Sequence, residues 1–140
     1  MMGKKRIKPK KKKAEIGGHD VTKNVEKEGG TDGEYPVFSF KHCDDNRYCL
    51  WELDENELKQ LMRFFKKMES MRWVDVKRHR GFRWETYEQS DVPGLPKNLP
   101  PDAKIIHLKV TKPFVIFGYR IGGVFHIVWF DPDHNVHDMS

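Results

Sequence analysis

The stretch that decides the fold covers residues 113–130 and reads PFVIFGYRIGGVFHIVWF. Its β-branched and aromatic residues favour two strands, and Gly122-Gly123 between them favours a tight hairpin turn, because glycine accepts the positive φ that such a turn needs. Both faces of this hairpin are largely apolar, so we expect it at the centre of a sheet that is covered on each side. The turn sets the register and predicts these facing pairs: Ile121 with Val124, Arg120 with Phe125, Tyr119 with His126, and Gly118 with Ile127.

Alternation along the two strands assigns their side chains to the faces of the sheet. One face is predicted to carry Phe117, Tyr119, Ile121, Val124, His126 and Val128. The opposite face is predicted to carry Ile116, Gly118, Arg120, Phe125, Ile127 and Trp129. Arg120 and His126 are therefore expected on opposite faces of the hairpin.

Upstream of this hairpin, the sequence predicts a further strand, a helix and a second hairpin. Residues 104–110 have the composition of a strand, which makes three C-terminal strands. Asp54 and Glu57 have the spacing of a capping box and predict a helix start. The buried stripe of this helix is predicted to consist of Leu58, Leu61, Met62, Phe65 and Met68. Residues 36–42 and 48–53 are β-prone around a turn-forming segment and predict an N-terminal hairpin. The fold expected is α+β: an antiparallel sheet packed on one main helix.

The composition predicts one domain and a tail. The 140-residue chain is 34% charged and has a net charge of +5. Residues 1–34 contain almost no large apolar side chains and eight basic residues between positions 4 and 13, so we expect a disordered lysine-rich tail followed by a single domain at 35–140. No apolar run approaches a membrane span and none follows the lysines as in a signal peptide. With two cysteines, Cys43 and Cys49, the expected location is the cytoplasm.

The polar residues of the predicted sheet are the candidate catalytic groups. A buried Arg120 needs a partner or a ligand, because an unpaired buried charge is costly. Histidine is the usual acid or base near neutral pH, so His134 or His126 would transfer protons while Arg120 binds phosphate and Tyr119 orients or relays a proton. Arg120 and His126 are expected on opposite faces of the hairpin. We therefore prefer the pair Arg120 and His134 to the pair Arg120 and His126. His107, in the adjacent strand, is a reserve candidate for the acid or base.

Basic and aromatic residues interleave in residues 73–88, as a nucleic-acid surface requires. The alternative is a loop whose aromatics pack under the domain. After it, four prolines between 93 and 101 predict an irregular connection. The candidate nucleic-acid contacts are Lys77, Arg78, Arg80, Arg83 and Trp84, with Lys59 and Arg63 on the polar side of the helix. A weaker interpretation is a zinc or manganese site at Asp131, Asp133, His134, His137 and Asp138; we assign no metal ligand and no cofactor.

Three segments are distinctive: the run from Phe117 to His134, with its GxR and VFxxxWFDPxH elements, the Phe-Ser-Phe start at 38–40, and Met-Glu-Ser-Met-Arg-Trp at 68–73. Together they resemble a bacterial family of short uncharacterised proteins. The resemblance covers about residues 36–136 and implies no activity. More distantly, a helix before three antiparallel strands is similar to RelE/ParE-like toxins, whose RelE branch cleaves mRNA on the ribosome. The usual start of that group has two helices, and here only one is recognisable.

Two functions from different classes follow. The first is a toxin-like RNA endonuclease of a toxin–antitoxin or mobile-element system. It would use metal-free acid/base chemistry, with RNA as substrate and an antitoxin or the ribosome as possible partners. The alternative is a non-catalytic module that binds nucleic acid or protein through the tail, the helix and the basic-aromatic segment.

Overall fold

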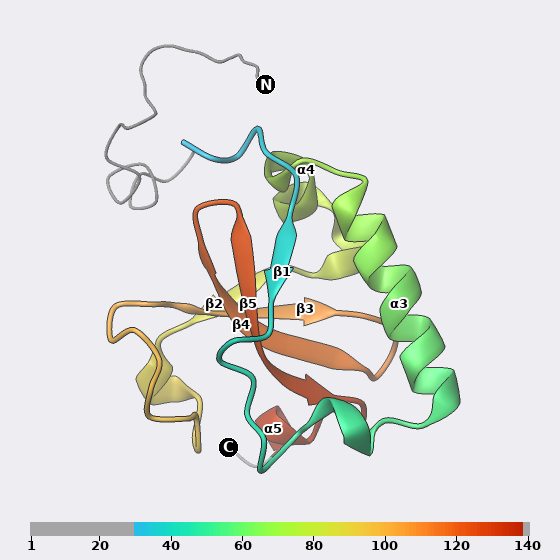
Figure 1. Ribbon diagram of the computed structural model, residues 1–140, viewed down its shortest axis with the longest axis vertical. Coiled ribbons are helices and arrows are strands. Elements are labelled where there is room, and N and C mark those ends of the chain that lie inside the picture. Colours follow the sequence, from blue (N-terminus) through green and yellow to red (C-terminus); the bar gives the residue numbers. More distant parts are fainter. Residues whose placement is uncertain (1–29, 139–140) are drawn as a thin grey trace.

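The computed structural model describes residues 30–138, which form a five-stranded sheet with the longest helix against one face (Figure 1). The strand order is β1-β5-β4-β3-β2; β1 runs parallel to β5 and the other neighbours are antiparallel. This architecture confirms the α+β class. The strands are β1 (Val37–Ser39), β2 (Glu85–Tyr87), β3 (Ile105–Lys109), β4 (Val115–Ile121) and β5 (Val124–Asp131).

The β4–β5 hairpin has the predicted turn and the predicted register. Gly122 has a φ of +61°, and the facing pairs from Ile121↔Val124 to Gly118↔Ile127 are all present. Beyond them a bulge shifts the register, so that Phe117 faces Trp129 and Val128 is the extra residue. Val128 and Trp129 consequently pack in the same cluster as Phe117. The predicted face of Trp129 is wrong for this reason.

The main helix α3 (Glu55–Glu69) begins at the predicted capping box, in which the Glu57 amide donates to Asp54 Oδ1 at 2.7 Å and the Asp54 amide to Glu57 Oε1 at 2.9 Å. Its buried residues are Leu61, Phe64 and Met68, with Phe65 half-buried. Leu58 and Met62 are 42% and 59% exposed, so their place in the predicted stripe is wrong. The helix turns its Phe64 side to the sheet and its Met62 side to solvent.

Two apolar clusters fill the two sides of the sheet. The first joins α3 and the short helix α4 (Trp73–Arg78) to the face that carries Ile116, Phe125 and Ile127. The second joins the irregular 88–103 connection and the C-terminal helix α5 (Asn135–Asp138) to the face that carries Phe117, Tyr119 and Trp129. Both sheet faces are therefore covered, as the apolar hairpin predicted.

The predicted N-terminal hairpin is wrong. Residues 37–39 pair with β5 instead, and residues 50–52 form a 3-10 turn, η1 (Leu50–Glu52). The segment between them follows β5: the Asp44 amide donates to the Val128 carbonyl at 3.0 Å, and the Phe130 amide to the Tyr48 carbonyl at 2.8 Å. These bonds to a distant strand replace the local pairing.

The domain starts earlier than the predicted boundary at residue 35. Residues 1–29, most of the predicted tail, lie outside the described residues. Residues 30–34 form a turn, in which the Glu34 amide donates to the Thr31 carbonyl, and this turn contacts α4 through the Trp73 and Val74 amides. The segment is therefore part of the folded domain.

Candidate active site

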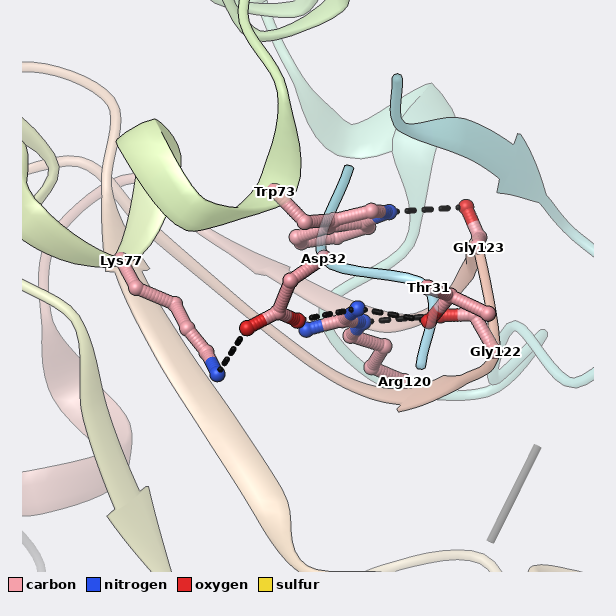
Figure 2. Close-up of polar contacts among 7 residues, drawn as sticks. All are labelled: Thr31, Asp32, Trp73, Lys77, Arg120, Gly122 and Gly123. Carbon is pink, nitrogen blue, oxygen red and sulfur yellow. Dashed lines mark hydrogen bonds and ion pairs between the residues drawn. The ribbon is translucent and has the colours of Figure 1, made fainter. Parts of the chain in front are cut away.

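Arg120 is held in a network at the glycine turn of the β4–β5 hairpin (Figure 2). Its Nη2 lies 2.8 Å from Asp32 Oδ1 and donates to Thr31 Oγ1 at 2.8 Å, and its Nε donates to the Gly122 carbonyl at 2.7 Å. The guanidinium also lies 4.4 Å from the centroid of the Trp73 ring. These contacts use the charge of Arg120 to fasten residues 31–32 to the sheet.

Lys77 completes this network from α4, with its Nζ 3.0 Å from Asp32 Oδ2. Burial alone would raise the pKa of the Asp32 carboxyl, but hydrogen bonds and charge attraction to Arg120 and Lys77 outweigh burial and hold that pKa below its ordinary 3.8. Asp32 is therefore ionised at neutral pH and pairs with both cations. Lys77, a predicted nucleic-acid contact, has a structural partner here.

Replacing Arg120 with alanine should lower the free energy of unfolding by about 2–3 kcal/mol. The Arg120 and Asp32 side chains are 11% and 20% exposed, so we place the loss between the roughly 0–1 kcal/mol of surface pairs and the roughly 3–5 kcal/mol of broken buried pairs. Urea unfolding measures it. Arg78→Ala, which removes one cation from an exposed position of the same domain, is the matched control and should change little. A loss below about 1 kcal/mol for Arg120→Ala would contradict the structural role.

Tyr119 and His126 lie on the opposite face of the hairpin, as the register predicted. Their rings stack at 4.8 Å with 12° between planes, and the Tyr119 hydroxyl is hydrogen bonded to Nδ1 of His42 from the loop after β1. Tyr119 is fully buried, and His126 Nδ1 is buried without a hydrogen-bond partner among the described residues. Burial, with the nearby charges of His42 and Lys41, lowers the pKa of His126 below 6.5.

This shift predicts a pH-dependent stability. Because the folded protein binds the His126 proton less readily than the unfolded chain, the free energy of unfolding should decrease as pH falls below the ordinary pKa of 6.5. In His126→Phe, which cannot titrate, the decrease should be smaller. Urea unfolding between pH 5 and 8, at about half-unit steps, measures both slopes. Equal slopes in the two proteins would contradict the assignment.

A different pair of histidines lines a hollow of about 450 Å³ at the far end of the sheet from the glycine turn. His107 is on β3, and His134 is in the loop after β5; their ring centroids are 5.4 Å apart. His134 has a left-handed backbone, with a φ of +58°. The buried Asp131 fixes this loop, because its carboxylate accepts from the Asn135 amide at 2.8 Å and the Val136 amide at 2.9 Å. The two imidazoles therefore come from a strand and from a braced loop.

The edge strand β2 supplies a carboxylate to this pair. Glu85 is the register partner of His107, and its Oε1 lies 3.4 Å from His107 Nδ1. The Tyr87 hydroxyl donates to the same Oε1 at 2.7 Å. Burial, followed by the bond and charge of Glu85, raises the pKa of Tyr87 to about 12, so this hydroxyl stays a donor throughout the neutral range. Tyr87 orients Glu85, and Glu85 faces His107.

Three cations line the same hollow: Arg83, Lys109 and Lys112. Lys109 is two residues from His107 on the same face of β3, and Lys112 lies in the β3–β4 turn. An anionic group in the hollow would therefore meet two imidazoles and several positive charges. We call this hollow, with His107, His134, Glu85 and these cations, the histidine site.

The predicted site residues divide among different regions. Of the four proposed catalytic residues, only His134 lines the histidine site; Arg120, Tyr119 and His126 lie toward the glycine turn. Lys59 Nζ lies 3.2 Å from Glu55 Oε2, and the rings of Trp84 and Trp73 pack edge to face with their centroids 6.0 Å apart. Arg78 and Arg80 are exposed. Arg83 lines the histidine site, and Arg63 lines a second hollow beside it.

Sequence reasoning missed Glu85, Lys109 and Lys112. It included Tyr87 only among the aromatics of the 73–88 segment, and it kept His107 only in reserve. The spacing of two residues along a strand could have grouped these side chains. It places Glu85 and Tyr87 on one face of β2, and His107 and Lys109 on one face of β3. That grouping required recognising residues 85–87 as a strand. Within the described part of the chain, no group of three or more His, Cys, Asp or Glu side chains is placed to hold a metal ion. His137 and Asp138 of the weaker metal interpretation have side chains outside that description.

Two further observations bear on partners. Among residues 30–138, none of the helices has the length and apolar character that crossing a membrane demands. Comparison of the chain with protein-family models, with curated proteins and with solved structures gives no match. Function must therefore be inferred from the histidine site itself.

Proposed function

We propose that this protein is an RNA endonuclease that cleaves its substrate by acid/base catalysis at the histidine site. The observation that carries the proposal is the pair His107 and His134, 5.4 Å apart between ring centroids, in a hollow lined by three cations. Two imidazoles can take up and donate one proton each near neutral pH, and this exchange needs no metal ion. The cations suit a phosphodiester.

In this proposal His107 is the base. Its two ring nitrogens are buried in the free protein, and Nδ1 faces Glu85, so RNA binding has to open access to Nε2. As it accepts the proton of the ribose 2′-hydroxyl, its ring becomes positively charged, and the Glu85 carboxylate 3.4 Å away stabilises that charge. The 2′-oxygen then forms a bond to phosphorus, while the bond from phosphorus to the 5′-oxygen breaks. His134 donates the proton that the leaving 5′-oxygen needs. The products are a 2′,3′-cyclic phosphate and a free 5′-hydroxyl.

The cations act on the phosphate. Negative charge increases on its oxygens as the fifth bond to phosphorus forms, and Arg83, Lys109 and Lys112 line the hollow where those oxygens would lie. In this proposal they take the part first expected of Arg120, whose charge is engaged by Asp32. Tyr119 and His126 have no part in the reaction.

The test is cleavage of a single-stranded RNA oligonucleotide by the full chain in the presence of a chelator. We expect cyclic-phosphate ends, no cleavage of the matching DNA, and no cleavage of RNA with a 2′-O-methyl group at every position, because the attacking hydroxyl is then absent. The experiment includes an arm with added ribosomes, since the predicted toxin acts there. Intact RNA in both arms, or equal cleavage of DNA, would contradict the proposal.

The toxin part of the proposal has its own readout. Expression of the wild-type chain in a bacterium should inhibit growth, and expression of His134→Asn at the same level should not. If the bacterium grows equally well with both chains, the toxin role is contradicted, and RNA cleavage alone remains as the proposed activity. Binding without cleavage would favour the alternative, a non-catalytic nucleic-acid module, which the cations lining the hollow also support.

A further inference from the structure

A second hollow, of about 220 Å³, lies on the other side of the β3–β4 turn from the histidine site. It is bounded by α3, by the short turn η2 (Arg80–Phe82) and by the end of β3. The buried rings of Phe64 and Phe82 form its floor, in edge-to-face contact at 5.4 Å. The hollow therefore has an apolar base that packing holds rigid.

The cations of this second hollow come from one flank of α3. Arg63 and Lys67, one helical turn apart, line it together with Lys109 of β3. Lys67 Nζ lies 5.7 Å from the centroid of the Phe82 ring, which keeps the ammonium over the floor. No carboxylate is among the residues that line this hollow. Its chemistry fits an anion.

The two hollows adjoin, because Lys109 and Thr111 line both. The Thr111 hydroxyl donates to Gln60 Oε1 of α3 at 3.0 Å, so the turn between the hollows is fastened to the helix. Five cations thus border a continuous path around this turn: Arg83, Lys112, Lys109, Arg63 and Lys67. A flexible chain with several negative charges would complement these cations along the path.

We propose that the second hollow binds a further backbone phosphate of the same RNA strand whose scissile phosphate occupies the histidine site. This inference deepens the proposed function and rests on it. The strand is single, since it has to bend around the β3–β4 turn to reach both hollows, which a double helix does not do locally. Arg63 and Lys67 add affinity and leave the chemistry to His107 and His134.

The experiment measures binding of an RNA oligonucleotide with 2′-O-methyl groups throughout, by fluorescence anisotropy over a range of salt concentrations. A cation that neutralises one phosphate of a single strand contributes about 0.7 to the slope of log affinity against log salt. Arg63→Gln and Lys67→Gln should each weaken binding several-fold and reduce that slope by about 0.7. Both residues are exposed, so neither change should disturb the fold.

The matched control is Lys59→Gln, on the same helix. Lys59 pairs with Glu55 and lines neither hollow. It should leave affinity and slope at the wild-type values. If Lys59→Gln weakens binding as much as Arg63→Gln, binding is spread over the whole helix and the inference is overturned. Wild-type affinity and slope in both hollow variants overturn it as well.

Cleavage kinetics separate this inference from the proposed function. With unmodified RNA, Arg63→Gln and Lys67→Gln should raise KM and leave kcat unchanged, because uniform binding is lost. If Arg63→Gln and Lys67→Gln reduce the salt slope as predicted but the wild type cleaves no RNA, the endonuclease fails and the phosphate site stands. If the wild type cleaves and the hollow variants have unchanged KM and binding, the phosphate site fails alone.

Discussion

RNA cleavage should slow by about 10²–10⁴-fold when His134 is replaced by asparagine or His107 by glutamine, the range that a positioned acid or base contributes. Asparagine suits position 134 because it tolerates the left-handed backbone there, where φ is +58°. Glutamine keeps a polar side chain at the buried position 107. Single-turnover cleavage measures the rates, and circular dichroism checks the fold.

The pH dependence of the same reaction assigns the roles. With one imidazole as base and one as acid, kcat/KM of the wild type should follow a bell-shaped curve. In His107→Gln, which lacks the base, the residual kcat/KM should no longer fall at low pH. In His134→Asn, which lacks the acid, it should no longer fall at high pH. The control is His126→Phe, on the same sheet face but toward the glycine turn; it should retain the full curve. Undiminished cleavage by folded His134→Asn would remove it from the mechanism.

The part of the fold predicted correctly depends on local chemistry. Gly122 and Gly123 set a turn whose geometry extends to the neighbouring pairs, so the register near the turn could be deduced from a few residues. The Asp54 capping box is local in the same way. The bulge at Val128 does not follow from local chemistry. Beyond it, Phe117 and Trp129 pack with segments that are distant in the sequence. Alternation counted from the turn therefore fails at Trp129.

Long-range pairing explains the other errors. β1 lies parallel to β5, which is more than eighty residues away along the chain, and no turn signal announces such a pairing. β2 consists of only Glu85–Tyr87, too short for a period-two pattern to stand out among basic and aromatic neighbours. These two strands form the edges of the sheet. The central strands carry the strong apolar pattern, and the edges do not.

The candidate site was predicted only in part, because much of it also depends on long-range contacts. Alternation separated Arg120 from His126, and the structure confirms that separation. The partner of Arg120, Asp32, belongs to a segment whose polar composition favours disorder, so the ion pair could not be anticipated. The histidine site depends on β2 facing His107 and on a loop that returns His134 to β3. Neither arrangement is encoded in local spacing.

Phe64→Ala should lower the free energy of unfolding by about 3–5 kcal/mol, the usual cost of deleting a buried aromatic ring. Phe64 is only 4% exposed. Its ring packs edge to face with Phe82, with centroids 5.4 Å apart, and lies in the cluster that joins α3 to the sheet. Its removal leaves a cavity that the rigid ring of Phe82 cannot fill. Urea unfolding, with m-values compared to confirm two-state behaviour, measures the loss.

Met62→Ala is the matched control on the same helix. Met62 is 59% exposed, so its loss should change stability by no more than about 0.5 kcal/mol. Phe65→Ala should fall between the two, because Phe65 is half-buried against Phe38 at 4.6 Å. The sequence pattern alone gives the reverse order for Phe64 and Met62, since it puts Met62 in the buried stripe. A larger loss for Met62→Ala than for Phe64→Ala would mean that α3 is rotated about its axis, and Arg63 and Lys67 would then no longer face the second hollow.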